Sequence, residues 1–416
     1  MTTSPRPFAA QALAAGSRIL GTGHHRPDRV MTNADLEQLV ETSDEWIRQR
    51  TGIEERRVAA DGVDVGDLAA IAGRNALADA GVDPSEITQV IVATCSNHER
   101  SPSAAGRVAQ QLGIPAPAAF DVGAACSGFE HALAVADMSI RTGASTTTLV
   151  IGAEKLSAVT DYTDRTTCIL TADGAGAMVL TASDQPGIAP VVWGTVPELA
   201  DAVTINGEGP AFAQQGRQVL GWALREAPKI SQRIVEAAGL TMEDIDVFVP
   251  HQANLRMIEP LAAALGLRED AIVADDIITS GNTSAATIPL AISRMREAGR
   301  IPSGATALLV GFGGGFSWAG QVVRLPLSAA LSGPARRCPP ACRRRPWSAP
   351  RPPHRPGARR SRRGRSRAPT ARRRPTPTRL PGSSARRAGG RRSTPARRTC
   401  HGSSGAAPPR RRRRSP

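Results

Sequence analysis

The sequence predicts a layered α/β fold made of two similar halves. Short apolar segments alternate along the chain with segments in which apolar residues recur at helical spacing. One such strand, ITQVIVAT at 87–94, is rich in β-branched residues, which is typical of a strand covered on both faces. Part of this order repeats about 158 residues later, which indicates that a domain has been duplicated.

The expected elements follow one another in a regular order. A strand at 18–23 comes first, and a helix starts near Thr32 and breaks at Gly52. A second helix at 67–80 ends at Gly81, because glycine readily adopts the left-handed conformation of a helix C-cap. The remaining expected elements are a strand at 87–94, a helix at 103–112, a buried strand at 118–122, a helix from Cys126 to about 140, and strands at 147–152 and 177–181.

Three pairs of positions carry the repeat, and they occur in the same order in both halves. The segment AGVDPSEITQVIVAT, which begins at Ala80, is echoed by AGLTMEDIDVFVPHQ, which begins at Ala238. The pairs lie at offsets of 158, 159 and 156 residues: Ile87 with Ile245, Gly152 with Gly311, and the turn at Cys126 with Asn282. Each half should therefore present an equivalent turn between a strand and a helix.

Charge is distributed unevenly along the chain. The formal net charge of +15 by itself suggests a nucleic-acid partner. However, residues 327–416 contain 28 arginines and no acidic residue, so the first 326 residues carry 24 basic and 37 acidic side chains, a net charge of −13. The globular part is therefore acidic, and the excess of positive charge belongs to one terminal segment.

This terminal segment is rich in Arg, Pro, Ala, Ser and Gly and has no hydrophobic periodicity, which predicts disorder. A basic arm for nucleic acid or an acidic partner is one interpretation, but Trp347 is the only aromatic residue there that could stack on a base. We favour a frameshifted or read-through end instead. The predicted organisation is an N-terminal extension at 1–17, two halves at 18–185 and 186–326, and the tail at 327–416.

Composition also indicates the compartment. The six cysteines show no paired spacing, which argues against a disulfide framework and favours a reducing environment. No apolar run approaches the ~18 residues expected of a membrane-spanning helix. We therefore expect a cytoplasmic protein.

Cys126 is the candidate nucleophile. It follows an apolar strand and opens a helix in the segment FDVGAACSGFEHALAVA at 120–136. Small residues around it let the backbone bend sharply and let a substrate approach closely. The free amides and the dipole at a helix N-terminus favour the thiolate, so we expect the pKa of Cys126 to be lowered. A buried, inert cysteine is the alternative interpretation.

Three further features stand at comparable positions. His251 follows an apolar strand, at the end where ligands bind in α/β sheets, and Asn282 lies in the turn SGNTSAATIP that opens a helix. The loop GFGGGF at 311–316 could offer unhindered amides to an oxyanion. Their structural alternatives are a buried histidine, a helix cap and a plain turn. Two packed halves would bring Cys126, His251 and Asn282 toward one cleft, and no metal-ligand spacing, dinucleotide fingerprint or phosphate loop is present.

Together these motifs are similar to a known family. GAACSGF, VPHQANLRMI, SGNTSAATIP and GFGGGFSWAG, with TSDEWIRQRTGI and ADGAGA, resemble the β-ketoacyl-acyl carrier protein synthase III family of the thiolase superfamily over about residues 18–325. The resemblance implies a five-layered αβαβα fold and a homodimer. It also implies a decarboxylative Claisen condensation of an acyl-CoA starter with malonyl-acyl carrier protein, in fatty-acid or polyketide synthesis, with acyl-CoA as a substrate and no cofactor or metal.

The resemblance assigns roles to individual residues. Cys126 would carry the acyl thioester, and His251 and Asn282 would stabilise the enolate formed from the malonyl group. The amides of Cys126 and Gly314 would form the oxyanion hole. The other assigned positions contact the carriers of the acyl groups: Trp46 and Arg165 at the CoA adenine, Arg50 at its phosphates, Gly216 and Asn254 along the pantetheine tunnel, and Arg256 where the acidic carrier protein docks.

The sequence also departs from the family. The family often has an aromatic residue at the position of Ser101, contributed across the dimer, and a large apolar residue at that of Thr171, and the segment between Val191 and Phe212 is short. We therefore expect a wider acyl pocket suited to a branched or otherwise unusual starter. A same-fold acyltransferase, which passes its acyl group to an alcohol or amine without decarboxylation, is the nearest alternative. Nucleic-acid binding through the tail is a more distant one.

Overall fold

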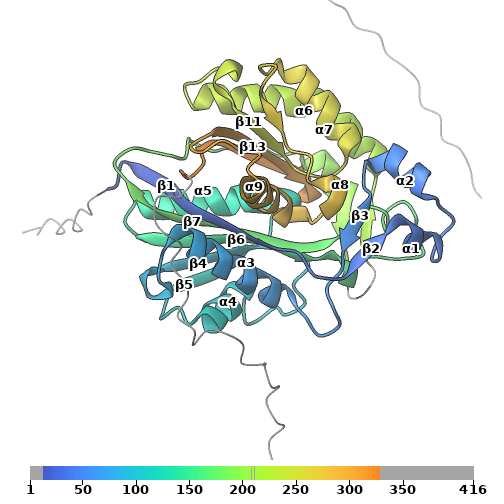
Figure 1. Ribbon diagram of the computed structural model, residues 1–416, viewed down its shortest axis with the longest axis horizontal. Helices are drawn as coiled ribbons and strands as arrows, with labels where there is room; N and C mark the ends of the chain where they lie inside the picture. The colour runs from blue at the N-terminus through green and yellow to red at the C-terminus, as the bar shows by residue number, and fades with distance from the viewer. Residues whose placement is uncertain (1–12, 208, 210, 328–416) are drawn as a thin grey trace, which may run out of the picture. The chain divides into compact units, whose positions relative to one another are not determined.

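Two β-sheets with helices between and outside them form the described part of the chain (Figure 1). The computed structural model describes residues 13–207, 209 and 211–327. Residues 1–12 of the N-terminal extension and residues 328–416 of the tail, for which we predicted disorder, lie outside the described residues. Five layers follow one another in Figure 1, which confirms the αβαβα fold. The helices of the three helical layers are α6 (Gly216–Ala237) with α7 (Leu255–Leu265), α5 (Gly128–Arg141) with α9 (Thr287–Glu297), and α3 (Val65–Ala80) with α4 (Ala104–Leu112).

The first sheet has five strands in the order β1-β7-β6-β4-β5. Its strands are β1 (Gly16–His25), β7 (Asp173–Ser183), β6 (Thr147–Lys155), β4 (Gln89–Ala93) and β5 (Ala118–Val122). β7 pairs antiparallel with both β1 and β6, whereas β6, β4 and β5 run parallel. The carboxyl ends of these parallel strands therefore meet at one edge of the sheet, which is where α/β folds place their ligands.

The second sheet repeats this pattern with strands from the second half of the chain. Its order is β8-β14-β13-β11-β12, and its strands are β8 (Val192–Thr195), β14 (Ser317–Arg324), β13 (Thr306–Gly313), β11 (Val247–Pro250) and β12 (Ile272–Val273). β14 is antiparallel to both of its neighbours, and β13, β11 and β12 are parallel. The identical order and directions confirm the predicted duplication.

The pairing of the two turns differs from the sequence-based prediction. A short 3₁₀ turn at Ala125–Ser127 precedes α5, and another at Ser284–Ala286 precedes α9. Both begin with a non-glycine residue at positive φ, 44° at Ala125 and 45° at Ser284. The structural offset is therefore 159 residues, so Cys126 corresponds to Ala285 and not to Asn282. The predicted offset of 156 was wrong because it matched the two chemically prominent residues instead of the backbone.

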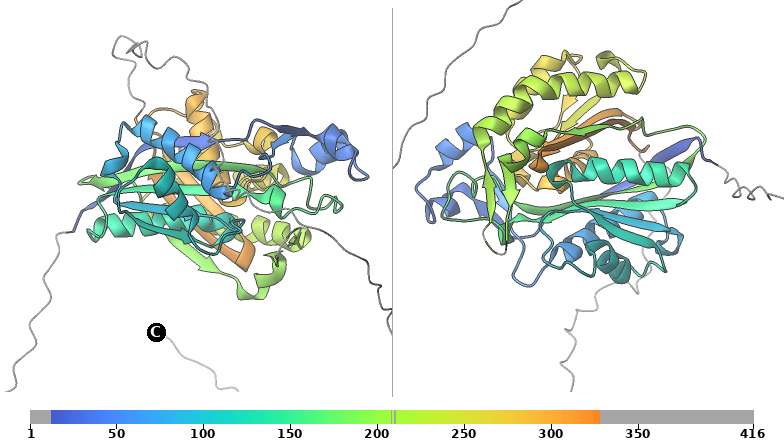
Figure 2. Two further views of the ribbon diagram at one scale, coloured as in Figure 1. Left: turned by 90° about the horizontal axis from the view of Figure 1, so that it is seen from below. Right: turned by 180° about the vertical axis from the view of Figure 1, so that it is seen from behind.

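The central layer is the most deeply buried part of the fold. α5 and α9 lie between the two sheets, as the rear view in Figure 2 also shows for α5. The first seven residues of α9 are all buried, and so are Phe129 and Leu133 of α5. A helix covered on both sides is apolar around most of its circumference, which explains why these segments carry no charged outer face like that of α6.

The segment after Thr32 is not the single helix that we predicted. It forms α1 (Asn33–Glu37) and α2 (Asp44–Thr51), and the chain between them is not helical. The hydroxyl of Ser43 accepts a hydrogen bond from the amide of Trp46 at 3.1 Å and so starts a new helix. A good N-cap residue inside a helical pattern favours a break, because its side chain replaces the missing backbone partner.

The remaining elements are short. They are the paired strands β2 (Val30–Thr32) and β3 (Glu55–Arg57), the paired strands β9 (Val203–Ile205) and β10 (Phe212–Gln214), and α8 (Ile277–Ser280). β5 was predicted to be buried, but it lies at the edge of its sheet and none of its residues is fully buried. Among the described residues, the helices lack the combination of length and apolarity that crossing a membrane requires.

Candidate active site

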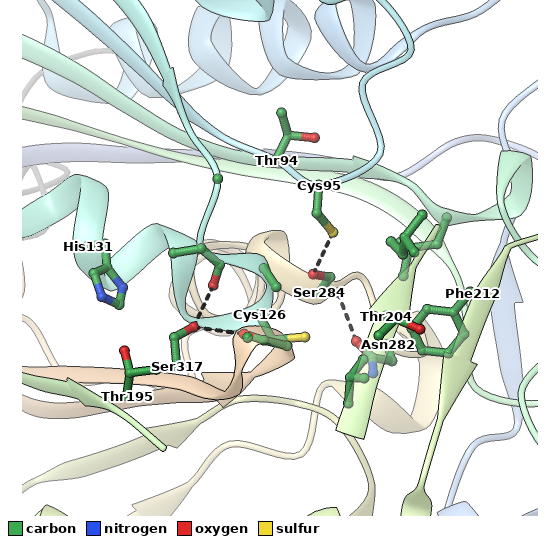
Figure 3. Close-up of a pocket in the computed structure, with 18 residues that line it drawn as sticks. Thr94, Cys95, Cys126, His131, Thr195, Thr204, Phe212, Asn282, Ser284 and Ser317 are labelled. Carbon is green, nitrogen blue, oxygen red and sulfur yellow. Dashed lines mark hydrogen bonds between the residues drawn. The ribbon is translucent and has the colours of Figure 1, made fainter. Parts of the chain in front are cut away.

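A cavity of about 530 Å³ opens around Cys126 and is lined by residues from both halves (Figure 3). Its polar and aromatic lining residues are Thr94, Cys95, Cys126, His131, Thr195, Thr204, Phe212, Asn282, Ser284 and Ser317. Figure 3 shows Cys126 between Ser317 on one side and Ser284 and Asn282 on the other. The cavity therefore combines a nucleophile from the first half with hydrogen-bonding groups from the second.

Cys126 is held at the junction of β5 and α5, as the sequence predicted. The strand ends at Val122, and the 3₁₀ turn places Cys126 two residues before the first residue of α5. The sulfur lies against the backbone of β13, where a Cβ on Gly313 would stand 2.7 Å from Sγ. Only glycine leaves room for the nucleophile there, because real Cβ atoms do not approach other atoms so closely.

The pKa of the Cys126 thiol is opposite to our expectation. Burial raises this pKa to about 11, because the effect of burial is larger than that of the hydrogen bonds that stabilise the thiolate. Those hydrogen bonds come from the Ser284 hydroxyl and from the backbone amides of Gly314 and of Cys126 itself. The predicted lowering was wrong, since a helix N-terminus contributes little compared with removal of the sulfur from water. The thiol is protonated in the free protein at neutral pH.

Two backbone amides converge at the sulfur. One is the amide of Cys126, in the 3₁₀ turn Ala125–Ser127, which we call the nucleophile turn. The other is the amide of Gly314, in the glycine-rich loop after β13. Donors in this arrangement suit an oxygen that gains negative charge next to the sulfur, as in attack on a thioester. The oxyanion-hole role of these two amides stays a prediction.

His251 lies directly after β11, as predicted, but it is almost fully buried and does not line the cavity itself. Its Nδ1 is 2.8 Å from the Thr287 hydroxyl, which in turn is 2.9 Å from the carbonyl oxygen of Ser284. The edge of the ring packs against Phe312, with 6.0 Å between the ring centroids. Burial lowers the pKa of His251 to about 3, so the imidazole is neutral.

Asn282 lines the cavity and is fixed by both its backbone and its side chain. Its amide donates to the carbonyl of Leu170, and its own carbonyl accepts from the amide of Ala172. Its side-chain Oδ1 accepts from the amide of Ser284 at 2.8 Å. The side-chain nitrogen is thus the atom that Asn282 can offer to a ligand. Through Ser284 and Thr287, Asn282 is connected to His251.

Comparison with known proteins agrees with this site. The family model "3-Oxoacyl-[acyl-carrier-protein (ACP)] synthase III" matches residues 120–197, and the model of its C-terminal part matches residues 235–325. A beta-ketoacyl-[acyl-carrier-protein] synthase III of Streptomyces avermitilis is 54% identical over 314 residues, covering 75% of this chain and 99% of that protein. The chain belongs to the 3-oxoacyl-[acyl-carrier-protein] synthase III family. It is therefore an enzyme of the ketosynthase type.

Other synthase III relatives give the same result. A synthase III of Streptomyces coelicolor is 52% identical, again over 75% of this chain and 99% of that protein. The solved priming β-ketosynthase of the R1128 polyketide biosynthetic pathway has a TM-score of 0.75 and 38% identity, covering 77% of this chain and all of that one. A solved synthase III from Aquifex aeolicus has a TM-score of 0.71 and 39% identity, covering 74% of this chain and all of that one.

The predicted CoA-binding residues of this synthase III form a separate cluster outside the cavity lining. The guanidinium carbons of Arg165 and Arg50 lie 5.2 Å and 5.6 Å from the centroid of the Trp46 ring. Arg165 also donates to the carbonyl of Glu41 at 2.9 Å. The cluster thus offers one aromatic face and two cations, which suits a purine with attached phosphates.

The start of α7 lies beside this cluster. The C-cap of α2, Gly52, packs against Leu255 so closely that a Cβ there would stand 2.1 Å from Cδ1. Asn254 uses its side chain to cap α7, accepting from the amide of Arg256 at 2.9 Å, and Arg256 itself is exposed. Gly216 is the exposed first residue of α6, and a Cβ there would meet nothing within 4 Å. Nothing in its surroundings requires a glycine.

Sequence reasoning missed a group of residues on the far side of the cavity. Cys95 lines it, donates to Glu154 at 3.2 Å and lies 3.5 Å from the Ser284 hydroxyl. Burial raises the pKa of Cys95 well above its usual range. Cys95 follows β4 as Cys126 follows β5, so its position at a strand end was a signal that could have found it.

Of the two positions that depart from the family, Thr171 does not shape the cavity as we expected, whereas the role of Ser101 across a dimer stays a prediction. Thr171 is buried, bonds to Thr160 at 2.7 Å and does not line the cavity, and Ser101 is exposed. The short segment does contribute directly, since Thr195, Val203, Thr204, Ile205 and Phe212 all line the cavity. Of the departures from the family, this segment, and not Thr171, helps to bound the cavity.

Proposed function

We propose that this chain joins the acyl group of an acyl-CoA starter to malonyl-acyl carrier protein with loss of carbon dioxide, and so initiates a fatty-acid or polyketide chain. One observation carries the proposal: in a member of this family, Cys126, two convergent amides and Asn282 share one cavity. The reaction requires a nucleophile for the starter and donors for an enolate, and the cavity holds both.

In the first half-reaction the Cys126 sulfur attacks the thioester carbon of the acyl-CoA. The thiol proton leaves, the carbonyl oxygen gains charge, and the amides of Cys126 and Gly314 donate to this oxygen. The tetrahedral intermediate then collapses, the bond to the CoA sulfur breaks, and CoA departs as a thiol after taking up a proton. The product is an acyl thioester on Cys126.

In the second half-reaction the malonyl group loses carbon dioxide. The electron pair of the broken carbon–carbon bond moves onto the thioester oxygen as an enolate, and the Asn282 side-chain nitrogen and the His251 ring stabilise it. The enolate carbon attacks the acyl group on Cys126, and the released sulfur takes up a proton. A neutral His251 fits this role, because it leaves no buried positive charge when the enolate has gone.

The surroundings of the cavity support the expected partners. An adenine would enter between Trp46 and Arg165 by displacing the guanidinium from the ring, Arg50 would meet the phosphates, and Arg256 would meet the acidic carrier protein. Gly216 and Asn254 stand on the proposed pantetheine route. Acyl-CoA is a substrate in this proposal, and no cofactor or metal takes part. The free thiols of the described residues fit the cytoplasm.

Intact-protein mass spectrometry tests this function directly. The full chain and Cys126→Ala are mixed with a panel of acyl-CoAs, and malonyl-acyl carrier protein is then added. We expect an adduct that requires Cys126 and that malonyl-acyl carrier protein discharges as a β-ketoacyl product with release of carbon dioxide. An adduct that malonyl-acyl carrier protein fails to discharge would instead indicate an acyltransferase that does not decarboxylate.

The same panel tests the starter. We propose a branched or otherwise unusual starter, because the short segment that includes Thr195 and Thr204 bounds a cavity of about 530 Å³. Rates of adduct formation with acetyl-, isobutyryl- and longer acyl-CoAs give the preference. A strong preference for acetyl-CoA would contradict the proposal.

A further inference from the structure

Two serine hydroxyls join the two halves of the protein next to Cys126. The Oγ atoms of Ser127 and Ser317 lie 2.8 Å apart, although the residues are 190 positions apart in the chain. Ser127 directly follows the nucleophile in its 3₁₀ turn, and Ser317 begins β14 directly after the glycine-rich loop. Figure 3 shows Ser317 bonded to the nucleophile turn.

Each hydroxyl is also bonded to a backbone carbonyl of these two segments. Ser317 lies 2.9 Å from the carbonyl oxygen of Gly314 and 3.2 Å from that of Ala124, and Ser127 lies 3.0 Å from that of Ala124. A serine hydroxyl has one hydrogen and two lone pairs, so each can donate once and accept from the other. In the arrangement with the shortest hydrogen bonds, the Ser317 hydroxyl donates to the Gly314 carbonyl and accepts from the Ser127 hydroxyl.

These contacts involve Gly314 and, in the other segment, Ala124 and Ser127, which flank Cys126. They therefore lie next to the two amides that converge at the sulfur. The loop that carries Gly314 contains three consecutive glycines, 313–315, and Gly315 has a φ of 105°. Glycine has little conformational preference of its own, so the direction of the Gly314 amide depends on outside contacts. The Ser317 bond to the Gly314 carbonyl, together with the bond from Ser127 to Ser317, supplies such contacts.

We propose that the Ser127–Ser317 pair positions the amides of Cys126 and Gly314 relative to each other, so that both point at the same oxygen during acyl transfer. This inference deepens the proposed function and rests on it. Ser127 and Ser317 are positioning residues, because they act on the reacting atoms through the amides.

The two steps of the reaction should depend differently on the serine pair. Formation of the acyl thioester places negative charge on the oxygen that the two amides contact, so it depends on their alignment. Loss of carbon dioxide from the malonyl group places charge near Asn282 and His251 instead. Disturbing the serine pair should therefore slow acylation and leave malonyl decarboxylation nearly unchanged, whereas a general loss of structure would slow both.

Single-turnover acylation by acyl-CoA tests the inference in the full chain. We expect Ser317→Ala to slow acylation about 10- to 100-fold, which is less than the roughly 100- to 1000-fold lost when an oxyanion donor is removed, because both amides remain. The acyl-CoA concentration that gives half-saturation should change little. Ser317→Thr keeps the hydroxyl and should restore the rate. The double variant Ser127→Ala/Ser317→Ala should be no slower than Ser317→Ala, because the two residues act as one unit.

A matched control is Ser231→Ala, which removes a buried hydroxyl from α6 that does not line the cavity. It should change the melting temperature about as much as Ser317→Ala does and leave acylation unchanged. Wild-type acylation rates in Ser317→Ala, or an equal slowing of acylation and malonyl decarboxylation, would overturn the inference.

A second readout does not depend on activity. Amide hydrogen exchange in the segment 311–320 should become faster in Ser317→Ala than in wild type, and Ser317→Thr should restore it. Unchanged exchange would overturn the inference even if acylation slowed. If the wild-type chain took no acyl group from any acyl-CoA, the proposed function would fail, and the exchange measurement would still decide whether the pair holds the loop.

Discussion

Two effects act on the Cys126 thiol in opposite directions. The amides of Gly314 and Cys126 and the Ser284 hydroxyl stabilise the thiolate, whereas burial and the nearby Glu154 carboxyl destabilise it. Burial prevails, and the resulting pKa is about 11. A thiol with a raised pKa reacts slowly with electrophiles at neutral pH, since the thiolate is the reactive form.

This pKa makes a prediction for alkylation. Because the thiolate fraction rises about tenfold per pH unit below the pKa, the rate of Cys126 alkylation by iodoacetamide should rise about tenfold per unit from pH 7 to pH 10 without reaching a plateau. Peptide mass spectrometry follows the rate at this one residue. The variant Cys95→Ala is the control, because Cys95 lines the same cavity. A plateau near pH 7 would show that the pKa is lowered after all.

The second prediction at this scale concerns Gly313. A Cβ at this position would stand 2.6 Å from the Cβ of Cys126, so Gly313→Ala should displace the nucleophile and slow acylation at least about 100-fold. Gly221→Ala is the matched control, because a Cβ there meets only the flexible end of Arg225. It should leave acylation unchanged and stabilise α6 by about 0.5–1 kcal/mol. Normal acylation in Gly313→Ala would show that the site can accommodate the methyl group.

The three principal site residues could be predicted because sequence patterns reveal the ends of elements well. Cys126 and His251 each follow an apolar strand, and Asn282 lies in the turn that precedes α9. Ser284 could not be found in this way, since its importance comes from contacts with groups distant in sequence, such as the Cys95 thiol. The pKa of Cys126 was also out of reach, because it depends on burial by the opposite half of the protein.

At the scale of single elements, α2 connects local sequence to the proposed CoA site. Its N-cap Ser43 bonds to the amide of Trp46, and the ring of Trp46 is the surface on which Arg165 stacks. The start of the helix therefore sets where the ring lies. The helix was predicted, but its separation from α1 was not, because both halves of the pattern look helical and only the cap reveals the break.

Removal of this cap should have two effects. Ser43→Ala should destabilise the protein by about 1 kcal/mol, as loss of an N-cap usually does, and raise the KM for acyl-CoA several-fold because Trp46 is less well placed. Ser103→Ala removes the equivalent cap of α4, where the hydroxyl bonds to the amide of Gly106 at 3.1 Å. It should cost similar stability and leave KM unchanged. An unchanged KM in Ser43→Ala would show that the start of α2 does not affect CoA binding.

At the scale of the whole molecule, the duplication explains why the described residues contain one nucleophile turn and not two. With the structural offset of 159, Cys126 corresponds to Ala285, and Gly313, which makes room for the sulfur, corresponds to Glu154. Glu154 bonds to Cys95 and lies 3.5 Å from the amide of Ala285, so its side chain occupies the region next to the second turn. The second half has thus kept the backbone and supplies Asn282 and Ser284 instead.

The last prediction concerns assembly and is based on the edge strand β5. β5 lies at the end of the first sheet, where its outer edge pairs with no other strand of the described residues, and it carries Phe120, which is 36% exposed. Exposed edges of this kind pair readily with another strand, and a second copy of β5 would extend the sheet symmetrically. We therefore expect a homodimer with about twice the 43.6 kDa mass of the chain.

Light scattering after size-exclusion chromatography measures this mass. Phe120→Asp should give monomers, because two such copies would place like charges against each other at the shared edge. Leu224→Asp changes an exposed apolar residue on α6, away from this edge, and should leave the dimer intact. The nucleophile turn directly follows β5, so loss of pairing should also reduce acylation in Phe120→Asp. A Phe120→Asp variant that remains dimeric would place the interface elsewhere and remove this link between assembly and the position of Cys126.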